Sequence, residues 1–284
     1  SRLDAKKDKN IIHRRQLLSY SIYGEKNPAS DVLTPSELKK IKQEELTELI
    51  KSLPNYSHRI LYYGNKDRKS LTSLLKKYHK IPLKFLEVKN KIKKYQEKDY
   101  EKNYVFWTNF DMVQTEIILL SRLEPLDNEK TAAINLFNQY FGGGMNSIVF
   151  QEIREAQGLA YAVFSNYSQA SKSDRSDYLL SYVGVQNDKQ SEALSSMFEL
   201  INELPKSEQA FEIAKKAILN KIESERITKS SVLSYYLSAE KKGVDYDIRE
   251  KIYDEVKTMT LEKLKRFHEK YIKEKPHNLS LIHI

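Results

Sequence analysis

The stretch NQYFGGGMNSIVFQEIREAQGLAYAVFSNYS, residues 138–168, differs in character from the rest of the chain. It holds three consecutive glycines, although the chain has only eight glycines among 284 residues. The glycines separate two segments with helical apolar spacing, and Arg154 and Tyr161 follow seven residues apart around Gly158. Glycine commonly ends a helix, so the pattern predicts a helix, a turn, a short second helix and then a strand.

Composition places the chain among globular proteins of one or two domains, with 40% apolar and 31% charged residues. No apolar run reaches 18 residues, so no membrane span is expected, and the lack of cysteine excludes disulfides and thiolate metal sites. The net charge of +9 fits either a nucleic-acid binder or a lysine-rich solvated surface. Because lysines alternate with acids in KNKIKKYQEKDYEKNY (89–104), the solvated surface is favoured and no nucleic-acid partner is expected.

An internal repeat organises the chain. LSYSIYGEK at 18–26 resembles LSYYLSAEK at 233–241, an offset of 233 − 18 = 215. The same register aligns apolar residues at helical spacing over some forty positions, as where Leu46 meets Leu261 and Leu49 meets Leu264. This predicts two copies of one unit, of which the first lacks its front part. We expect residues 1–88 to be the back half of the first copy, 89–103 a charged linker and 104–278 the second copy.

The last six residues, LSLIHI at 279–284, have two interpretations. They match the translation of a common sequencing adaptor, which makes 279–284 an adaptor scar, and this interpretation is favoured. The alternative is a short apolar final strand, which the repeat would also place after KPHN. No functional argument rests on these positions.

Local signals predict an α+β fold, with an antiparallel-rich sheet and helices packed on one face. Thr34-Pro35-Ser36-Glu37 is a capping box, and Asp127 and Gly243 mark the start and the end of two further helices. Strands are expected at 59–64, 112–122, 161–168 and 177–185, and helices at 44–53, 127–140, 146–157 and 230–243, with two apolar helical stripes over 194–204 and 211–222.

Several kinds of site are disfavoured by spacing. GGGMNS lacks the lysine of a phosphate-binding loop, and a helix rather than a strand precedes it, which disfavours a dinucleotide site. No G-x-S-x-G is present, nor H-E-x-x-H or H-x-x-E-H, so no metal ligands are expected in this chain. The histidines are expected at the surface or on helix flanks; they are His13, His58, His79, His268, His277 and His283.

YFGGGMNSIVFQEIREAQGLAYAVFS (140–165) nevertheless resembles the C-terminal half of the pitrilysin/insulinase family of zinc metallopeptidases. The similarity is closest to long versions from Bacteroidetes-type bacteria, and it extends to LTPSELKKI, HRILYYG, ERITK, VDYDIR and LKRFHEKYIKEKP. Spacing alone favours a structural role for Arg154, on a polar helix face, and for Tyr161, in a strand. The resemblance favours a functional role for both.

The resemblance implies homologous α+β domains in pairs, with a peptide chamber between two halves. The N-terminal half would carry the zinc site, and the C-terminal half would supply Arg154 and Tyr161 as catalytic residues. A guanidinium and a phenol are suitable donors for the negative charge that peptide hydrolysis places on a carbonyl oxygen. The resemblance also implies that the segment around the glycines binds an extended peptide: Gly142, Gly143, Gly144, Met145 and Asn146.

Two functions remain open from the sequence. In the first, the chain is the substrate-binding portion of a zinc-dependent metalloendopeptidase, with peptide or unfolded protein as substrate and Zn²⁺ on an N-terminal half outside this chain. In the second, it is a non-catalytic peptide-binding or structural subunit of the same family. Family resemblance suggests a bacterial periplasmic or cell-envelope location.

Overall fold

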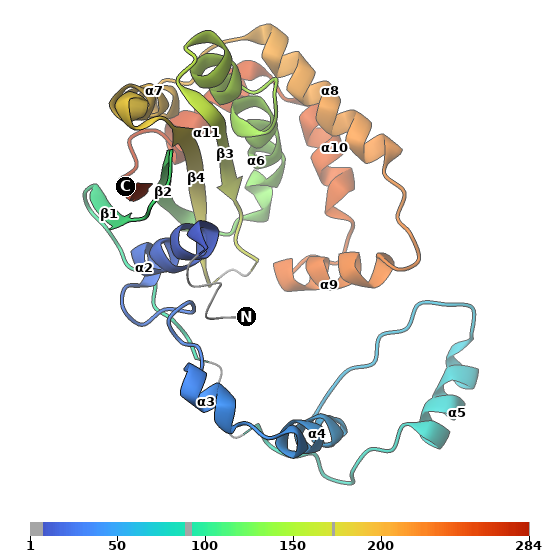
Figure 1. Cartoon of the computed structure of the whole chain (residues 1–284). Helices are drawn as coiled ribbons and strands as arrows, with labels where there is room; N and C mark the ends of the chain where they lie inside the picture. The colour runs from blue at the N-terminus through green and yellow to red at the C-terminus, as the bar shows by residue number, and fades with distance from the viewer. Residues whose placement is uncertain (1–7, 89–92, 172–173, 284) are drawn as a thin grey trace.

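The computed structural model describes residues 8–88, 93–171 and 174–283, and its centre is a five-stranded mixed sheet (Figure 1). The strands are β1 (Tyr104–Asn109), β2 (Thr115–Pro125), β3 (Ala160–Ser168), β4 (Ser176–Val185) and β5 (Asn278–His283). Their spatial order is β1-β5-β2-β4-β3, in which only the β1–β5 pair is parallel. The α+β class and the antiparallel-rich sheet are therefore confirmed.

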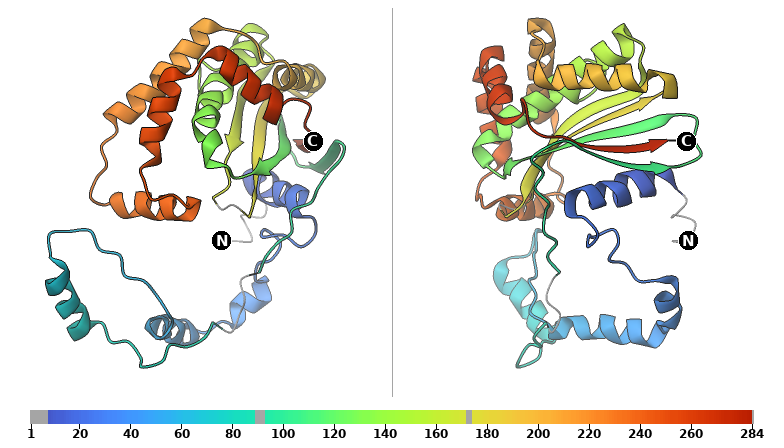
Figure 2. Two further views of the ribbon diagram at one scale, coloured as in Figure 1. Left: turned by 180° about the vertical axis from the view of Figure 1, so that it is seen from behind. Right: turned by 90° about the vertical axis from the view of Figure 1, so that its left-hand side faces the viewer.

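The main core lies between one face of this sheet and a layer of helices (Figure 2). Alternate residues of β2, such as Ile117 and Leu119, face this core because successive side chains of a strand point to opposite faces. The helices are η3 (Asn128–Lys130), α6 (Thr131–Phe137), η4 (Asn138–Gly142), η5 (Phe150–Ala156), η6 (Asn187–Lys189), α7 (Gln190–Asn202), α8 (Glu208–Ser224), α10 (Ile248–Thr258) and α11 (Leu261–Tyr271).

The opposite face of the sheet carries a helix as well, which corrects the expectation of helices on one face only. The continuous helical run η1 (Ile11–Leu17) and α2 (Leu18–Tyr23) lies against β5 (Figure 2, right). His13 is fully buried, and its Nε2 is 3.0 Å from the carbonyl oxygen of Ser280. Buried Glu116 on β2 lies 3.6 Å from His13 and pairs with Lys9 at 2.7 Å. His13 and Lys9 together lower the pKa of Glu116 to about 2.

Residues 28–88 form an arm without a core of its own, and no residue in it is buried. It contains α3 (Pro35–Lys40), which starts at the predicted capping box, then α4 (Gln43–Ser52), η2 (Leu53–Asn55) and α5 (Arg68–Tyr78). Its apolar side chains are nonetheless numerous and exposed, among them Leu49, Leu53, Ile60 and Leu83. Helix α9 (Val232–Lys242) lies beside this arm and also has no buried residue (Figure 1).

One element prediction fails for a reason of pairing, and the C-terminal stretch shows the converse. Residues 59–63, part of the strand predicted at 59–64, adopt no regular structure, because the described residues hold no neighbouring strand to accept their backbone hydrogen bonds. Conversely, residues 278–283 form β5 between β1 and β2. In the structure this stretch is therefore a short apolar final strand, as the alternative interpretation of 279–284 predicted. Whether these residues derive from an adaptor stays a prediction, and so do the domain limits.

Candidate functional site

The predicted site begins where the α6–η4 helix meets the outer edge of β3. Asn138 binds this edge twice: its Nδ2 donates to the Tyr167 carbonyl oxygen at 2.9 Å, and its Oδ1 accepts from the Tyr167 amide at 2.6 Å. One helical turn later Gly142 is buried against the same strand. A Cβ at this position would lie 2.0 Å from the Ser165 carbonyl oxygen and 2.5 Å from its nitrogen. The first glycine is therefore required by backbone packing.

The next four residues turn away from the sheet and are exposed. Gly144 has φ = +115°, a conformation that side chains disfavour, and an added Cβ would meet no atom within 4 Å. Its carbonyl oxygen accepts from Ser147 Oγ at 2.7 Å, which closes the turn. Met145 is 72% exposed, and Asn146 follows it at the surface. The turn therefore exposes to solvent both the glycine backbone and the thioether side chain of Met145.

Arg154 lies on η5, within the predicted second helix, and faces solvent. Its side chain is 43% exposed, with Nε 3.8 Å from the Glu155 carboxylate and the guanidinium 4.8 Å from the centre of the Phe150 ring. No hydrogen bond to the guanidinium is found among the residues that the structure describes. Most of its five N–H donors therefore remain available to a ligand.

Tyr161 owes its orientation to a β-bulge in β3. Ala160 pairs with Val185 and Ala162 with Gly184, so Tyr161 is the extra residue on its strand. As a result Tyr161 and Ala162 are both exposed, although adjacent strand residues normally face opposite sides. Gln186, just after β4, donates from Nε2 to Tyr161 Oη at 2.6 Å. This hydrogen bond holds the phenol on the solvent-exposed side of β3.

The structure thus places all the predicted residues on consecutive elements, with different degrees of exposure. Residues 143–146, Arg154 and Tyr161 are accessible, whereas Gly142 is buried. Arg154 and Tyr161 contact different neighbours, and the turn at Gly158, with φ = +62°, separates their elements. Gln186 and Asn138 were not predicted, because their partners are reached only through tertiary structure.

Among the described residues the histidines do not gather into a metal centre, and the surface prediction is wrong for three of them. His13, His268 and His277 are buried. Burial lowers the pKa of His268, and burial also lowers that of His277 to about 4. His58 and His79 hydrogen-bond to each other between their Nε2 atoms at 2.7 Å. In the described part of the chain no three His, Cys, Asp or Glu residues converge, so these residues do not fit a zinc site.

Comparison with known proteins adds a family context. The sequence model of the family described as "Peptidase M16 inactive domain" matches residues 40–218. An "Uncharacterized zinc protease" of Mycobacterium leprae is 42% identical over 55 residues, which are 19% of this chain and 12% of that protein. The chain therefore matches only a small part of this curated relative's length.

Solved structures show the same fold. The peptidase M16 inactive domain from Pseudomonas fluorescens superposes with a TM-score of 0.72 at 16% identity, covering 99% of this chain and 67% of that one. The periplasmic protease PqqL from Escherichia coli superposes with a TM-score of 0.69 at 12% identity, covering 99% of this chain and 32% of that one. No helix of the described residues is long and apolar enough to cross a membrane.

Proposed function

This chain belongs to the peptidase M16 family, the pitrilysin/insulinase metallopeptidases, and corresponds to their inactive C-terminal domain, and on that premise we propose that it is the substrate-binding portion of a zinc-dependent endopeptidase. In this proposal Zn²⁺ and its ligands belong to an N-terminal half, in the same polypeptide or in a separate subunit. The residues described here do not fit a zinc site, so this chain's own task is confined to the peptide.

The observation that carries the proposal is the bulge at Tyr161. A regular strand would bring Tyr161 and Ala162 to opposite faces, whereas the extra residue leaves the phenol on the open side, 2.6 Å from Gln186. β-bulges are frequent next to active sites because they re-aim one side chain. Arg154, on the element immediately before, offers unpaired guanidinium donors near the same turn.

These two groups suit the oxygen of a peptide carbonyl. During hydrolysis this oxygen gains negative charge, and preorganised N–H and O–H donors stabilise that charge more than they stabilise the neutral ground state. The Arg154 guanidinium would donate two N–H groups in a fixed fork, and the Tyr161 hydroxyl would donate one O–H. Gln186 donates to the phenolic oxygen, which leaves the phenolic proton free to point at the substrate.

The glycine turn would hold the peptide backbone. Residues 143–146 are exposed and Gly143 and Gly144 carry no side chain, so an extended peptide could approach their N–H and C=O groups closely. Met145 and Asn146 would contact the peptide side chains. Gly142 would anchor this turn to β3, through its packing on the Ser165 backbone.

Substitutions in the complete protease test the proposal. With an internally quenched peptide as substrate, Arg154→Ala and Tyr161→Phe are each expected to lower kcat/KM by about 10²–10³, the effect of removing one donor to a developing oxyanion. Arg226→Ala and Tyr246→Phe are matched controls at exposed positions outside the site, and both should retain activity. Unchanged kcat/KM in both site variants would refute the assignment.

A non-catalytic subunit is the second candidate, favoured by the inactive-domain family match and by the absence of a metal cluster from the described residues. It predicts that the natural gene product binds peptide but contains no stoichiometric zinc. Metal analysis with a peptide-binding titration on that product separates the two functions. Both candidates share peptide or unfolded protein as ligand, and a bacterial periplasmic or cell-envelope location is part of the proposal.

A further inference from the structure

A trough of about 900 Å³ lies beside β1, at the edge of the sheet that is remote from Tyr161. Its walls come from the end of α2 and the turn after it, from residues 94–100 of the predicted linker and from the start of β1. Strand β3, which carries Tyr161, forms the opposite edge of the sheet. Pockets that bind ligands usually measure about 300–1,000 Å³, so the trough is large enough for a ligand and is separate from the proposed peptide site.

Aromatic side chains line this trough, and their rings are tilted against one another. Four ring pairs form within the set, with centroids 5.0–6.1 Å apart and planes 54–70° apart. Each of the rings is at least partly exposed, and surface of this kind commonly serves binding. The six residues are Tyr20, Tyr23, Tyr95, Tyr100, Tyr104 and Phe106.

The acids beside the trough are already neutralised by cations outside its lining. Carboxylate oxygens of Glu97 and Asp99 lie 3.5 and 3.4 Å from the Arg122 guanidinium. Asp31, in the turn after α2, pairs with Lys93 at 2.7 Å. The alternation of lysines and acids in the sequence predicted a balanced, solvated surface, whereas the structure sorts the two kinds of charge.

The lysines of the trough are left without such partners. Among the described residues no carboxylate pairs with Lys26, Lys94 or Lys98. The backbone amide of Lys98 donates to the Ile22 carbonyl oxygen at 2.7 Å, which fixes this lysine beside α2. Of the acids in the lining, Glu25 alone lacks a paired cation within the described part of the chain, so the trough carries an excess of positive charge.

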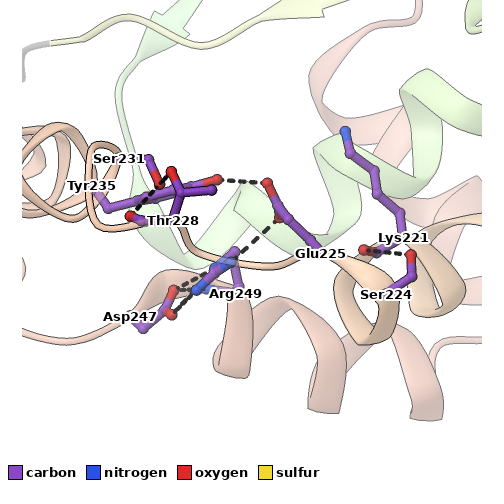
Figure 3. Close-up of polar contacts among 8 residues, drawn as sticks. All are labelled: Lys221, Ser224, Glu225, Thr228, Ser231, Tyr235, Asp247 and Arg249. Atoms are coloured by element: carbon purple, nitrogen blue, oxygen red, sulfur yellow. Dashed lines mark hydrogen bonds and ion pairs between the residues drawn. The ribbon is translucent and has the colours of Figure 1, made fainter.

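A cluster of similar composition at α9 shows the contrasting arrangement, in which the groups bind one another (Figure 3). Tyr235 and Arg249 both donate to the Glu225 carboxylate, at 2.5 and 3.3 Å, and Arg249 also pairs with Asp247. The Arg249 guanidinium lies 4.7 Å from the centre of the Tyr235 ring. In the trough, by contrast, no described cation lies over the Tyr20 ring, so its exposed face is accessible to a ligand.

We propose that the trough binds an acidic glycan, a chain of sugar rings that carries carboxylate, sulfate or phosphate groups. The C–H groups of a sugar ring carry slight positive charge and pack on the electron-rich faces of tyrosine rings. A puckered sugar fits between faces that meet at 54–70°, whereas a flat nucleobase gains most from parallel faces. The lysine ammonium groups pair with the acidic groups of the chain, and the phenol hydroxyls hydrogen-bond to sugar hydroxyls.

Calorimetric titration of the 284-residue chain with defined glycans tests the proposal. Oligogalacturonate supplies carboxylates, a heparin oligosaccharide supplies sulfates, and maltohexaose supplies uncharged sugar rings. At least one acidic glycan should bind about 10-fold more tightly than maltohexaose, with an affinity that falls as salt rises, and the tighter of the two identifies the acidic group. Equal affinity for maltohexaose, or no binding of either acidic glycan, would overturn the proposal. Tighter binding of a single-stranded oligothymidylate would assign the trough to nucleic acid instead.

Substitutions locate the binding. Tyr20→Ala should weaken binding of the acidic glycan about 3- to 10-fold, whereas Tyr20→Phe keeps the ring and should retain most of the affinity. Lys94→Gln combined with Lys98→Gln should weaken binding about 5-fold or more. Tyr236→Ala and Lys229→Gln are matched controls, and because all five positions are exposed, circular dichroism should be unchanged in every variant. Losses as large in the controls, or full affinity in the trough variants, would show that the glycan does not bind in the trough.

Discussion

Replacing Gly142 by alanine distinguishes a structural role of the glycine run from a role in peptide binding alone. The added Cβ would lie 2.0 Å from the Ser165 carbonyl oxygen and 2.5 Å from its nitrogen, and both belong to the backbone of β3. Strand backbone cannot rotate away as the end of a side chain can, so the η4–β3 contact must open. Overpacking costs about 1–3 kcal/mol in general, and a backbone overlap this deep places Gly142→Ala at about 3 kcal/mol or more.

Thermal unfolding of the 284-residue chain measures this cost. For a unit of this size each kcal/mol shifts Tm by about 2–4 °C, so Gly142→Ala should lower Tm by about 6–12 °C. Far-UV circular dichroism and the fluorescence of Trp107, the single tryptophan, should report coincident transitions.

Gly158→Ala is the matched control, because Gly158 has φ = +62° but no atom within 4 Å of an added Cβ. Conformational strain alone should cost it about 1–2 kcal/mol. If Gly142→Ala unfolds within about 1 °C of the parent chain, the packing argument is wrong and Gly142 serves the ligand only.

Two further predictions concern polar side chains. In the active complete protease, Gln186→Ala should lower kcat/KM about 3- to 10-fold, because the Tyr161 phenol loses the hydrogen bond that orients it. In a Tyr161→Phe background the same substitution should have little further effect. Additive losses in the double variant would disprove the positioning role of Gln186. Buried His277 has a pKa of about 4, below its ordinary value of about 6.5, so the unfolded chain takes up a proton first as pH falls. Unfolding free energy should therefore drop by about 3 kcal/mol between pH 6.5 and 4, and urea midpoints for His277→Gln should show a correspondingly shallower decline.

The sequence predicted those elements whose signals are local. The Thr34 capping box, the helix end at the glycines and the left-handed Gly243 after α9 are all present, because each depends on residues within one or two turns. The three strands predicted within the second copy were recognised as alternating or apolar runs, and β2, β3 and β4 occur where those runs are. The site residues were located by family resemblance, and their catalytic role stays a proposal.

What the sequence could not provide depends on partners distant in the chain. Residues 59–63 have strand composition but pair with no strand among the residues that the structure describes, whereas β5 is a strand because β1 and β2 flank it. The bulge at Tyr161 follows from the register of β3 on β4, which no spacing within residues 138–168 encodes. His277 resembles any flank histidine in sequence, and only the packing of β5 beside β2 shows it to be buried beside Ser121.

The position of β5 has a kinetic consequence. Within the described sheet β1 pairs with β5 alone, and residues 110–277 separate the two in the chain. The β3–β4 hairpin can form from local contacts, and β2 then pairs with β4 across residues 126–175. Strand β1 must wait until the longer loop of residues 110–277 closes, which is the slow step in folds with many non-local contacts. Meanwhile β2 presents an unpaired apolar edge, the feature that makes partly folded sheets associate with one another. Refolding yield should therefore fall as protein concentration rises, until β5 pairs with β2 and covers its edge.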